Sequence, residues 1–386
     1  MNLMKEWFHK RAIKNLLIEV FKKSGIYYEH QTRGGKLPVF PKIHNVLETK
    51  DSIRYTFTLP NGVDPQTIEK KWFCFQQILG KELAIEGDIK RFVLHSFKHN
   101  KSLQAYSYNY SDWLPHLKGH SIPVVVGKDQ FGKRIVYDMT DSNSPHLLIA
   151  GETGSGKSSM VRVILSTWIQ HLPPESLQLY LGDLKNSEFH FLRRVQHVKK
   201  VCMEEAEMEL MLNQLWMEII KRRKCMEKYE VDHVIEYNKV TREYKLPYIV
   251  ICIDEVAMLE DETESMKIVR KISAVGRSLG VFLLLSMQRP DATVIDGKLK
   301  VNMTVRMGFQ CDSSLNAGII GTPGAEMLEQ SGQMIFKLKG LKKVQAPELK
   351  LEKAKKLLAP FRRKREIEVS DEVKEEPLFG VLDDEE

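Results

Sequence analysis

The chain has 386 residues, of which 42% are hydrophobic and 28% charged, a globular composition that excludes collagen-like, coiled-coil and wholly disordered proteins. Its net charge of +7 is unevenly distributed, because residues 366–386 hold ten acidic residues and one lysine while the rest of the chain carries +16. So basic a body favours a polyanionic partner, whereas the acidic segment is expected to be a disordered tail, with partner binding as the alternative.

Two further features of the sequence concern its location. It contains no apolar run of the roughly 18–20 residues that span a membrane, and its first ten residues lack the apolar core of a signal peptide. The five cysteines are an odd number without close pairs, so neither a disulfide framework nor a zinc module is expected. We therefore expect a cytoplasmic protein without a transmembrane segment.

Residues 1–25 are predicted to form a basic amphipathic helix. Within Met1–Lys23, apolar side chains recur at helical spacing on one face, and basic side chains surround them. The apolar set is Ile13, Leu16, Leu17 and Val20, and the basic set is Lys10, Arg11, Lys14, Lys22 and Lys23. Packing on its own domain is the expected role. Peripheral contact with the inner face of an anionic membrane, or docking on a partner, is the alternative.

Residues 26–118 are predicted to form a small α+β domain. Ile53–Leu59 alternates between apolar and polar side chains, which is typical of a half-buried strand. Pro65–Leu79 has the pattern of a helix, and Arg91–Ser96 that of a second strand.

From residue 119 to 345 the pattern changes to an α/β type. Short apolar runs alternate with longer helical stretches, and the runs are too continuous for half-exposed strands. These runs are His146–Ala150, Leu177–Leu181, Tyr248–Ile253 and Val281–Ser286. The long helix predicted at Glu204–Tyr229 carries Met208, Met211 and Met217 as expected core residues. We expect a mostly parallel sheet between helices.

After Gly340 the sequence predicts three smaller elements. An edge strand comes first, followed by a basic C-terminal helix within residues 346–365, centred on Leu349–Leu358. The acidic tail, residues 366–386, ends the chain.

The strongest motif is a complete P-loop that follows an apolar strand and opens an amphipathic helix. Its glycines let backbone amides surround phosphate oxygens, and the helix N-terminus adds a favourable dipole. The lysine is expected to reach the β- and γ-phosphates of ATP, and the following serine to bind Mg²⁺. The nucleotide-binding set is Gly151, Glu152, Thr153, Gly154, Ser155, Gly156, Lys157, Ser158 and Ser159.

A second motif supports ATP hydrolysis. The apolar run Tyr248–Ile253 ends in Asp254 and Glu255, and open α/β sheets place their ligands at the carboxyl ends of strands. Asp254 is expected to hold the Mg²⁺ shell together with Ser158, while Glu255 orients and deprotonates the attacking water.

Two polar residues flank the next strand. Gln288 follows Val281–Ser286 and is suited to sensing the γ-phosphate, although a loop amide that bonds backbone would look the same. Arg277 precedes that strand and has two interpretations, an ordinary surface charge or an arginine that completes the site of an adjacent subunit.

These motifs and several others resemble the FtsK/SpoIIIE family of DNA-pumping motors over roughly Ile122 to Leu338. The shared segments include an entry segment before the P-loop and a variant of the family's Asp-Pro-Lys segment with leucine in place of proline. They are Ile122–Gly132, Pro145–Ala150, Gly182–Phe189, Leu246-Pro247, Gly276–Gly280, Gln288–Pro290, Val294–Gly297, Lys300–Asn302, Arg306 and Gly324–Leu328.

The resemblance implies a RecA-like P-loop motor that forms a homo-hexameric ring around double-stranded DNA. It places Arg277 at the family's trans-acting arginine finger. It places Arg289 and Lys300 in the region that faces the pore, where they would contact DNA phosphates without reading sequence. The segment Cys311–Asn316 departs from the family, which normally has a lysine and an Asp-Ser-Arg there, so one pore contact is expected to be lost or moved.

The expected function is that of an ATP-driven translocase for DNA transfer or replication of a conjugative element or plasmid. The chain shows neither the membrane helices nor the winged-helix domain of chromosome-segregating members, so a relaxase or replication partner is expected to supply the DNA. Three alternatives stay open: a chromosome-segregation or cell-division motor, a secretion-type ATPase that moves protein, and a DNA-binding adaptor controlled by ATP.

Overall fold

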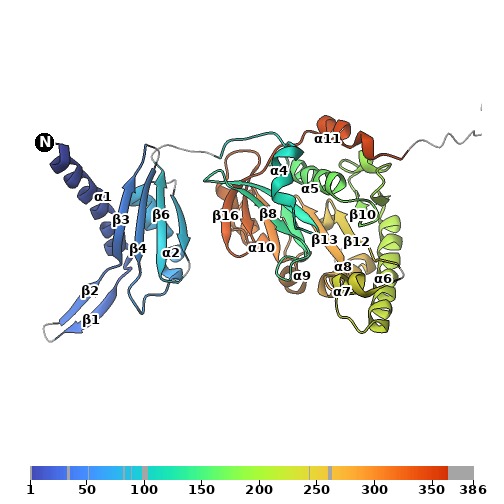
Figure 1. Cartoon of the computed structure of the whole chain (residues 1–386), viewed down its shortest axis with the longest axis horizontal. Helices are drawn as coiled ribbons and strands as arrows, with labels where there is room; N and C mark the ends of the chain where they lie inside the picture. Colours follow the sequence, from blue (N-terminus) through green and yellow to red (C-terminus); the bar gives the residue numbers. More distant parts are fainter. Residues whose placement is uncertain are drawn as a thin grey trace, which may run out of the picture. The chain divides into compact units, whose positions relative to one another are not determined.

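The computed structural model describes residues 2–32, 35–50, 52–80, 83–87, 89–97, 103–242, 244–259 and 263–363, so the expected acidic tail lies outside the described residues. The chain divides into two compact units (Figure 1). The first comprises Met1–Tyr106, Gly127–Ile135 and Lys343–Gln345, and the second Ser107–Val126, Val136–Lys342 and Ala346–Glu386. Within the described part of the chain, no helix is both long and apolar enough to cross a membrane.

The first unit contains the small α+β fold that the sequence predicts. Its antiparallel sheet has the order β3-β4-β6-β5, and a separate hairpin joins β1 to β2. The strand predicted at Ile53–Leu59 is β4, and the predicted helix at Pro65–Leu79 consists of two short helices. The elements are α1 (Asn2–Ser24), β1 (Tyr28–Thr32), β2 (Gly35–Val39), β3 (Lys42–Glu48), β4 (Ser52–Thr58), α2 (Gln66–Lys70), α3 (Trp72–Leu79), β5 (Leu83–Gly87) and β6 (Arg91–Phe97).

Helix α1 belongs to the core of this unit. Leu17, Val20 and Phe21 are completely buried against the sheet and α3. The Phe21 ring meets the Phe57 ring of β4 edge to face, with 5.1 Å between centroids. Leu16, expected on the same face, is 40% exposed. The apolar face of α1 therefore packs on its own domain, the first of the two roles that the sequence allowed.

A larger sheet is built mostly from residues of the second unit, and the segments Gly127–Ile135 and Lys343–Gln345 of the first unit also contribute to its strands. The elements are α4 (Tyr110–Leu117), β7 (Pro123–Asp129), β8 (Arg134–Asp138), β9 (Leu147–Ala150), α5 (Lys157–His171), β10 (Leu177–Gly182), β11 (Val198–Cys202), α6 (Glu205–Lys228), α7 (Val234–Val240), β12 (Tyr248–Ile253), α8 (Glu264–Val275), β13 (Val281–Met287), α9 (Gly297–Asn302), β14 (Val305–Phe309), α10 (Ser314–Ile320), β15 (Gln333–Lys337), β16 (Leu341–Gln345) and α11 (Leu351–Leu358). Short 3₁₀ helices occur at His190–Leu192, Val256–Met258, Ala325–Met327 and Ala359–Phe361.

The sheet has the order β11-β10-β12-β13-β9-β14-β15-β16-β7-β8 among the described residues. The six strands from β11 to β14 run parallel, whereas β15 is antiparallel to β14. Alternate residues of β12, such as Ile249 and Ile251, pack with helices α6 and α8, while Cys252 faces the other side and is equally buried. The predicted α/β fold with a mostly parallel sheet between helices is confirmed.

Two expectations about individual positions were wrong. Strand β16 is not an edge strand, because it lies between β15 and β7, and its Val344 and Gln345 pair with β7. Met217 is not a core residue, since it is 62% exposed while Met208 and Met211 are buried. Six residues after Met211, a helix has turned by about 600°, which carries Met217 away from the packed face.

The burial of α1 predicts contrasting effects for its two adjacent leucines. Leu17→Ala should lower the free energy of unfolding of the first unit by about 2–5 kcal/mol, because it leaves a cavity in a closed core. Leu16→Ala is the matched control and should cost less than about 1 kcal/mol, because its side chain is 40% exposed. Urea denaturation of the full chain, followed by circular dichroism, measures both. Equal costs would contradict the packing of α1.

His146 connects the two strands at the centre of the sheet. It lies directly before β9, is completely buried, and its Nδ1 accepts a hydrogen bond of 3.0 Å from the Leu283 amide of β13. Burial lowers the pKa of His146 to about 4. The folded protein therefore holds this ring neutral at pH values where the unfolded chain, with an ordinary histidine pKa near 6.5, binds a proton.

This difference predicts a loss of stability on acidification. Between pH 7 and pH 5 the unfolded state binds a proton at position 146 and the folded state does not, which lowers the free energy of unfolding by about 2 kcal/mol. In His146→Asn the amide oxygen still accepts from Leu283 but does not titrate. The wild type should lose about 2 kcal/mol more than this variant over that pH range. Parallel pH dependences in denaturant titrations would refute the assignment.

Candidate active site

The predicted catalytic residues converge on one edge of the sheet. The P-loop connects the carboxyl end of β9 to α5, Asp254 and Glu255 follow β12, and Gln288 follows β13. Because β13 lies between β9 and β12 and all three are parallel, their carboxyl ends meet at the same edge.

Two glycines fix the course of the P-loop. Gly151 has φ 157° and Gly156 has φ 108°. A Cβ on Gly151 would lie 2.5 Å from Phe309 Cβ, and one on Gly156 would lie 2.8 Å from the Gly332 amide nitrogen. The Gly332 amide also donates a 2.8 Å hydrogen bond to the Ser155 carbonyl. Neighbouring atoms, of the Phe309 side chain at Gly151 and of the Gly332 backbone at Gly156, thus exclude a side chain at both positions, and the turn before β15 supports the loop.

The remaining P-loop residues lie in different environments. Glu152 and Thr153 line a cleft, Gly154 is exposed, and Ser158 lies half-buried on the first turn of α5. The Ser159 hydroxyl accepts a hydrogen bond of 2.7 Å from the Leu349 amide, so it is occupied by the segment that leads into α11.

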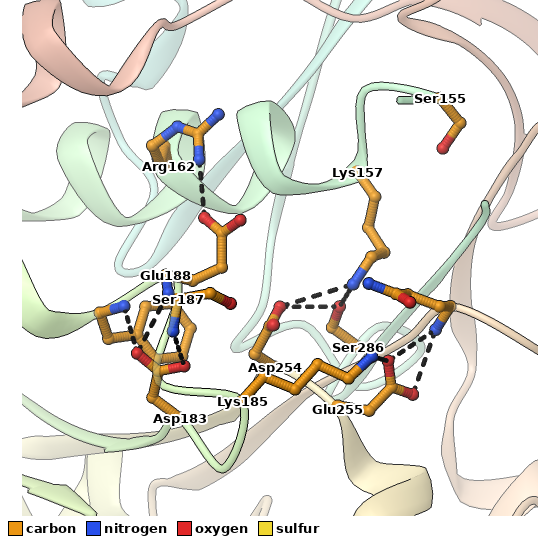
Figure 2. A network of polar contacts seen from close by, with 12 residues as sticks. Ser155, Lys157, Arg162, Asp183, Lys185, Ser187, Glu188, Asp254, Glu255 and Ser286 are labelled. Carbon is orange, nitrogen blue, oxygen red and sulfur yellow. Dashed lines mark hydrogen bonds and ion pairs between the residues drawn. The ribbon is translucent and has the colours of Figure 1, made fainter. Parts of the chain in front are cut away.

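Lys157 is the centre of a buried polar network, which Figure 2 shows. Its Nζ donates to Ser286 Oγ at 3.0 Å and lies 3.5 Å from Asp254 Oδ1. Both side chains of this ion pair are less than 5% exposed. Burial raises the pKa of Asp254, and the Lys157 ammonium partly opposes that rise. The Lys157 ammonium and the Asp254 carboxylate stabilise each other, because burying either charge without its partner would destabilise the fold.

Glu255 is held on the adjacent side of the network. Lys185 Nζ lies 2.7 Å from Glu255 Oε2 (Figure 2). The backbone N–H of Gln288 donates to both carboxylate oxygens, at 3.1 and 3.2 Å. The Glu255 side chain is buried, whereas Lys185 is 31% exposed. The expected catalytic base is therefore engaged by an ammonium group that solvent can reach.

The loop after β10 presents Lys185. Asp183, completely buried, accepts three backbone hydrogen bonds, from Ser187 at 3.0 Å, Glu188 at 3.1 Å and Phe189 at 2.7 Å. Glu188 in turn forms an ion pair with Arg162 of α5, at 2.6 Å (Figure 2). This ion pair connects the loop after β10 to α5, the helix that follows the P-loop.

A cleft of about 630 Å³ opens beside these groups. Its walls include Glu152, Thr153, Lys185, Glu255, Ala257, Met258, Gln288, Arg289 and Asp312. A Mg²⁺ ion that serves ATP usually takes one or two protein ligands and completes its shell with phosphate and water oxygens. The Ser158 hydroxyl and the Asp254 carboxylate supply oxygens of the required kind, so the donor set fits the predicted cofactor.

Three predicted residues occupy places that the sequence left undefined. Arg289 lines the cleft of about 630 Å³ beside the P-loop. Lys300 of α9 donates from Nζ to the Gly318 carbonyl at 3.2 Å. Arg277 lies before β13, at the opposite end of the strand from the P-loop, and its guanidinium donates to the Ser142 carbonyl at 3.4 Å.

Three contributing residues were given no role from the sequence. Ser286 bridges Lys157 and Asp254, Lys185 pairs with Glu255, and Asp183 organises the loop that carries Lys185. The Gly182–Phe189 motif was the only signal in the sequence that singled out two of them.

Known proteins resemble this chain over the segment that contains the candidate site. Residues 114–292 match the model of the FtsK/SpoIIIE family. Over 224 residues, 56% of this chain, it is 33% identical to DNA translocase FtsK of Borreliella burgdorferi; over 225 residues it is 35% identical to that of Treponema pallidum. Each alignment spans 28% of the relative's length.

Solved structures show the same fold. The pCW3 conjugation coupling protein TcpA, in a monomer form with ATPγS, matches with a TM-score of 0.60 and 26% identity, over 83% of this chain and 93% of that one. The cytoplasmic domain of the Thermomonospora curvata type VII secretion ATPase EccC matches with a TM-score of 0.58 and 21% identity, over 69% of this chain and 33% of that one.

The Lys185–Glu255 ion pair predicts that Lys185 restrains turnover. Its ammonium occupies the carboxylate that is expected to act as base, so Lys185→Met should raise ATP turnover without DNA severalfold. Lys185→Arg keeps the charge and should behave like the wild type. A steady-state ATPase assay decides: a fall in Lys185→Met that Lys185→Arg restores would show that Lys185 positions Glu255 for catalysis instead.

Proposed function

We propose that this chain, which contains a domain of the FtsK/SpoIIIE family, is an ATP-hydrolysing translocase of double-stranded DNA. The observation that carries the proposal is the buried Lys157–Ser286–Asp254 network beside Glu255, at the carboxyl edge where the P-loop ends. Hydrolysis at such a site requires that phosphates of ATP replace the present partners of the lysine and that a base activates water. Lys157 and Glu255 are the residues that we assign to these two tasks.

The residues divide the chemistry of hydrolysis between them. Lys157 binds β- and γ-phosphate oxygens and offsets their charge, as the P-loop amides do from the other side. Mg²⁺, held by Ser158 and Asp254, would neutralise further charge on the phosphates. Glu255 accepts the proton of the attacking water, and Gln288, in the wall of the same cleft, fixes the γ-phosphate.

Arg277 supports assembly into a ring. It precedes β13, whose seven residues extend over about 20 Å, so it lies a strand length away from the P-loop of its own subunit. A guanidinium in that place serves hydrolysis only in the site of a neighbouring copy. We infer a homo-hexamer in which Arg277 completes the adjacent site.

The proposed substrate is duplex DNA, bound without sequence preference. The charge of +16 outside the acidic tail favours a polyanion, and the FtsK relatives are named DNA translocases. Arg289 and Lys300 are the proposed phosphate contacts. Of these, Arg289 lines the nucleotide cleft, so contact with DNA would couple directly to the site of hydrolysis.

The biological role that we propose is DNA transfer or replication of a conjugative element or plasmid. The similarity to the conjugation coupling protein TcpA supports it, because it covers most of both chains. A relaxase or replication complex would then deliver the DNA. The match to the secretion ATPase EccC, at 21% identity, reflects the shared fold.

ATP turnover tests the proposal directly. Rates are measured without DNA, with single-stranded DNA and with long duplex, for the wild type and Lys157→Ala. We expect strong stimulation by duplex and loss of turnover in Lys157→Ala, because the lysine provides the main cationic contact to the phosphates. Wild-type turnover that is indifferent to all DNA would favour transport of protein.

Mixing subunits tests the ring. Arg277→Ala subunits added to wild type should lower activity more steeply than their share of the mixture, because each one disables a neighbour's site. A linear decline would show that Arg277 does not act between subunits.

A further inference from the structure

A groove lies between helix α1 and strand β3 of the first unit, and no part of the proposed mechanism uses it. Its volume is about 500 Å³. The side chains that line it include Trp7, Lys10, Arg11 and Lys14 of α1, and His44 and Asn45 of β3.

The two faces of α1 have separate roles. The apolar face is consumed by the core, where Leu17, Val20 and Phe21 are completely buried. Lys10, Arg11 and Lys14 are exposed and fall within one sector of about 100° on the helix, since a residue turns it by about 100°. They extend over about 6 Å of helix axis. Folding of the unit does not account for this cationic stripe.

Within the described part of the first unit, the cations of the groove have no carboxylate partner. Among the residues that the structure describes, no carboxylate pairs with Lys10, Arg11 or Lys14, and none lines the groove. Elsewhere in the unit lysines do pair, as Lys23 does with Glu19 at 2.8 Å and Lys36 with Glu29 at 2.9 Å. A concave cationic surface without carboxylates attracts a polyanion.

An aromatic ring adds order to the groove. The guanidinium of Arg11 lies 5.1 Å from the centre of the Trp7 ring, and Trp7 is itself 55% exposed. This cation–π contact restrains Arg11 while leaving its charge unpaired, which lowers the entropy cost of a later phosphate contact.

We propose that this groove is a second DNA-contact site, which binds the phosphodiester backbone of duplex DNA without reading its bases. The inference rests on the proposed function, since it takes duplex DNA as the substrate. Along each strand a duplex presents a phosphate about every 3.4 Å of axis, so the 6 Å stripe on α1 can meet two neighbouring phosphates. A membrane surface fits less well, because the apolar face that lipid would receive is inside the domain.

Salt dependence of duplex binding measures the contact. The full chain is titrated against a fluorescein-labelled duplex of mixed sequence, by fluorescence anisotropy, over a series of salt concentrations. The slope of log K against log salt is negative, and in the triple variant Lys10→Gln, Arg11→Gln, Lys14→Gln its magnitude should fall by about 2–3, because each lost phosphate contact removes about 0.9. Turnover without DNA should not change, because the three residues belong to the unit that lacks the catalytic groups.

The matched control removes the same charge from other exposed positions of the unit. Lys22→Gln, Lys23→Gln, Lys36→Gln should change the slope by less than about 1. A groove variant with the wild-type slope, or equal losses in both triple variants, would overturn the proposal. So would loss of binding to phosphatidylserine vesicles with an unchanged slope on DNA, which would assign the groove to a membrane. Wild-type protein that does not bind duplex at all would instead refute the proposed function.

Discussion

A lysine and an aspartate that share one buried place at the edge of a parallel sheet determine the layout of the second unit. Lys157 and Asp254 are nearly inaccessible to solvent and lie 3.5 Å apart. Either charge would be costly there without the other, so the P-loop after β9, which leads to Lys157, and the end of β12, which leads to Asp254, must lie at the same edge of the sheet. The interposed β13 meets that demand because it contributes Ser286, a residue small enough to fit between them and polar enough to bond both.

The same constraint explains why the proposed catalytic base, Glu255, is the adjacent residue. Consecutive side chains at a strand end point in different directions, so Asp254 faces the P-loop lysine while Glu255 turns toward the Gln288 amide and Lys185. The loop that brings Lys185 there is itself shaped by the buried carboxylate of Asp183. Two acids thus have different tasks: Asp183 accepts hydrogen bonds from three backbone amides and shapes the loop, whereas Glu255 lines the cleft.

Local patterns and contacts across the fold differed in how well the sequence revealed them. The P-loop and the Asp254-Glu255 strand end were recognisable because each function is encoded within a few consecutive residues. The parallel sheet followed from continuous apolar runs. Ser286 was given no role because its partners follow other strands of the sheet, and its position in the chain carries no signal. Lys185 stood in a recognisable motif, but the motif did not reveal that its partner is Glu255. The position of β16 inside the sheet and the exposure of Met217 depend on which other strands and helices pack beside them, and the sequence of a single segment does not contain that information.

Hydrogen bonds connect the P-loop to the segments around β15 and α11, so the stability of those segments is coupled to the conformation of the P-loop. Gly332 supports the Ser155 carbonyl, and Leu349 bonds the Ser159 hydroxyl, while the Ala346 amide donates to the Gly332 carbonyl. Any change in the P-loop that accompanies nucleotide binding must therefore alter the free energy of these hydrogen-bonded segments. Thermodynamic linkage is reciprocal. Tension applied to the chain beyond Leu349 would therefore change the affinity for nucleotide by the same factor by which nucleotide changes the stability of these segments.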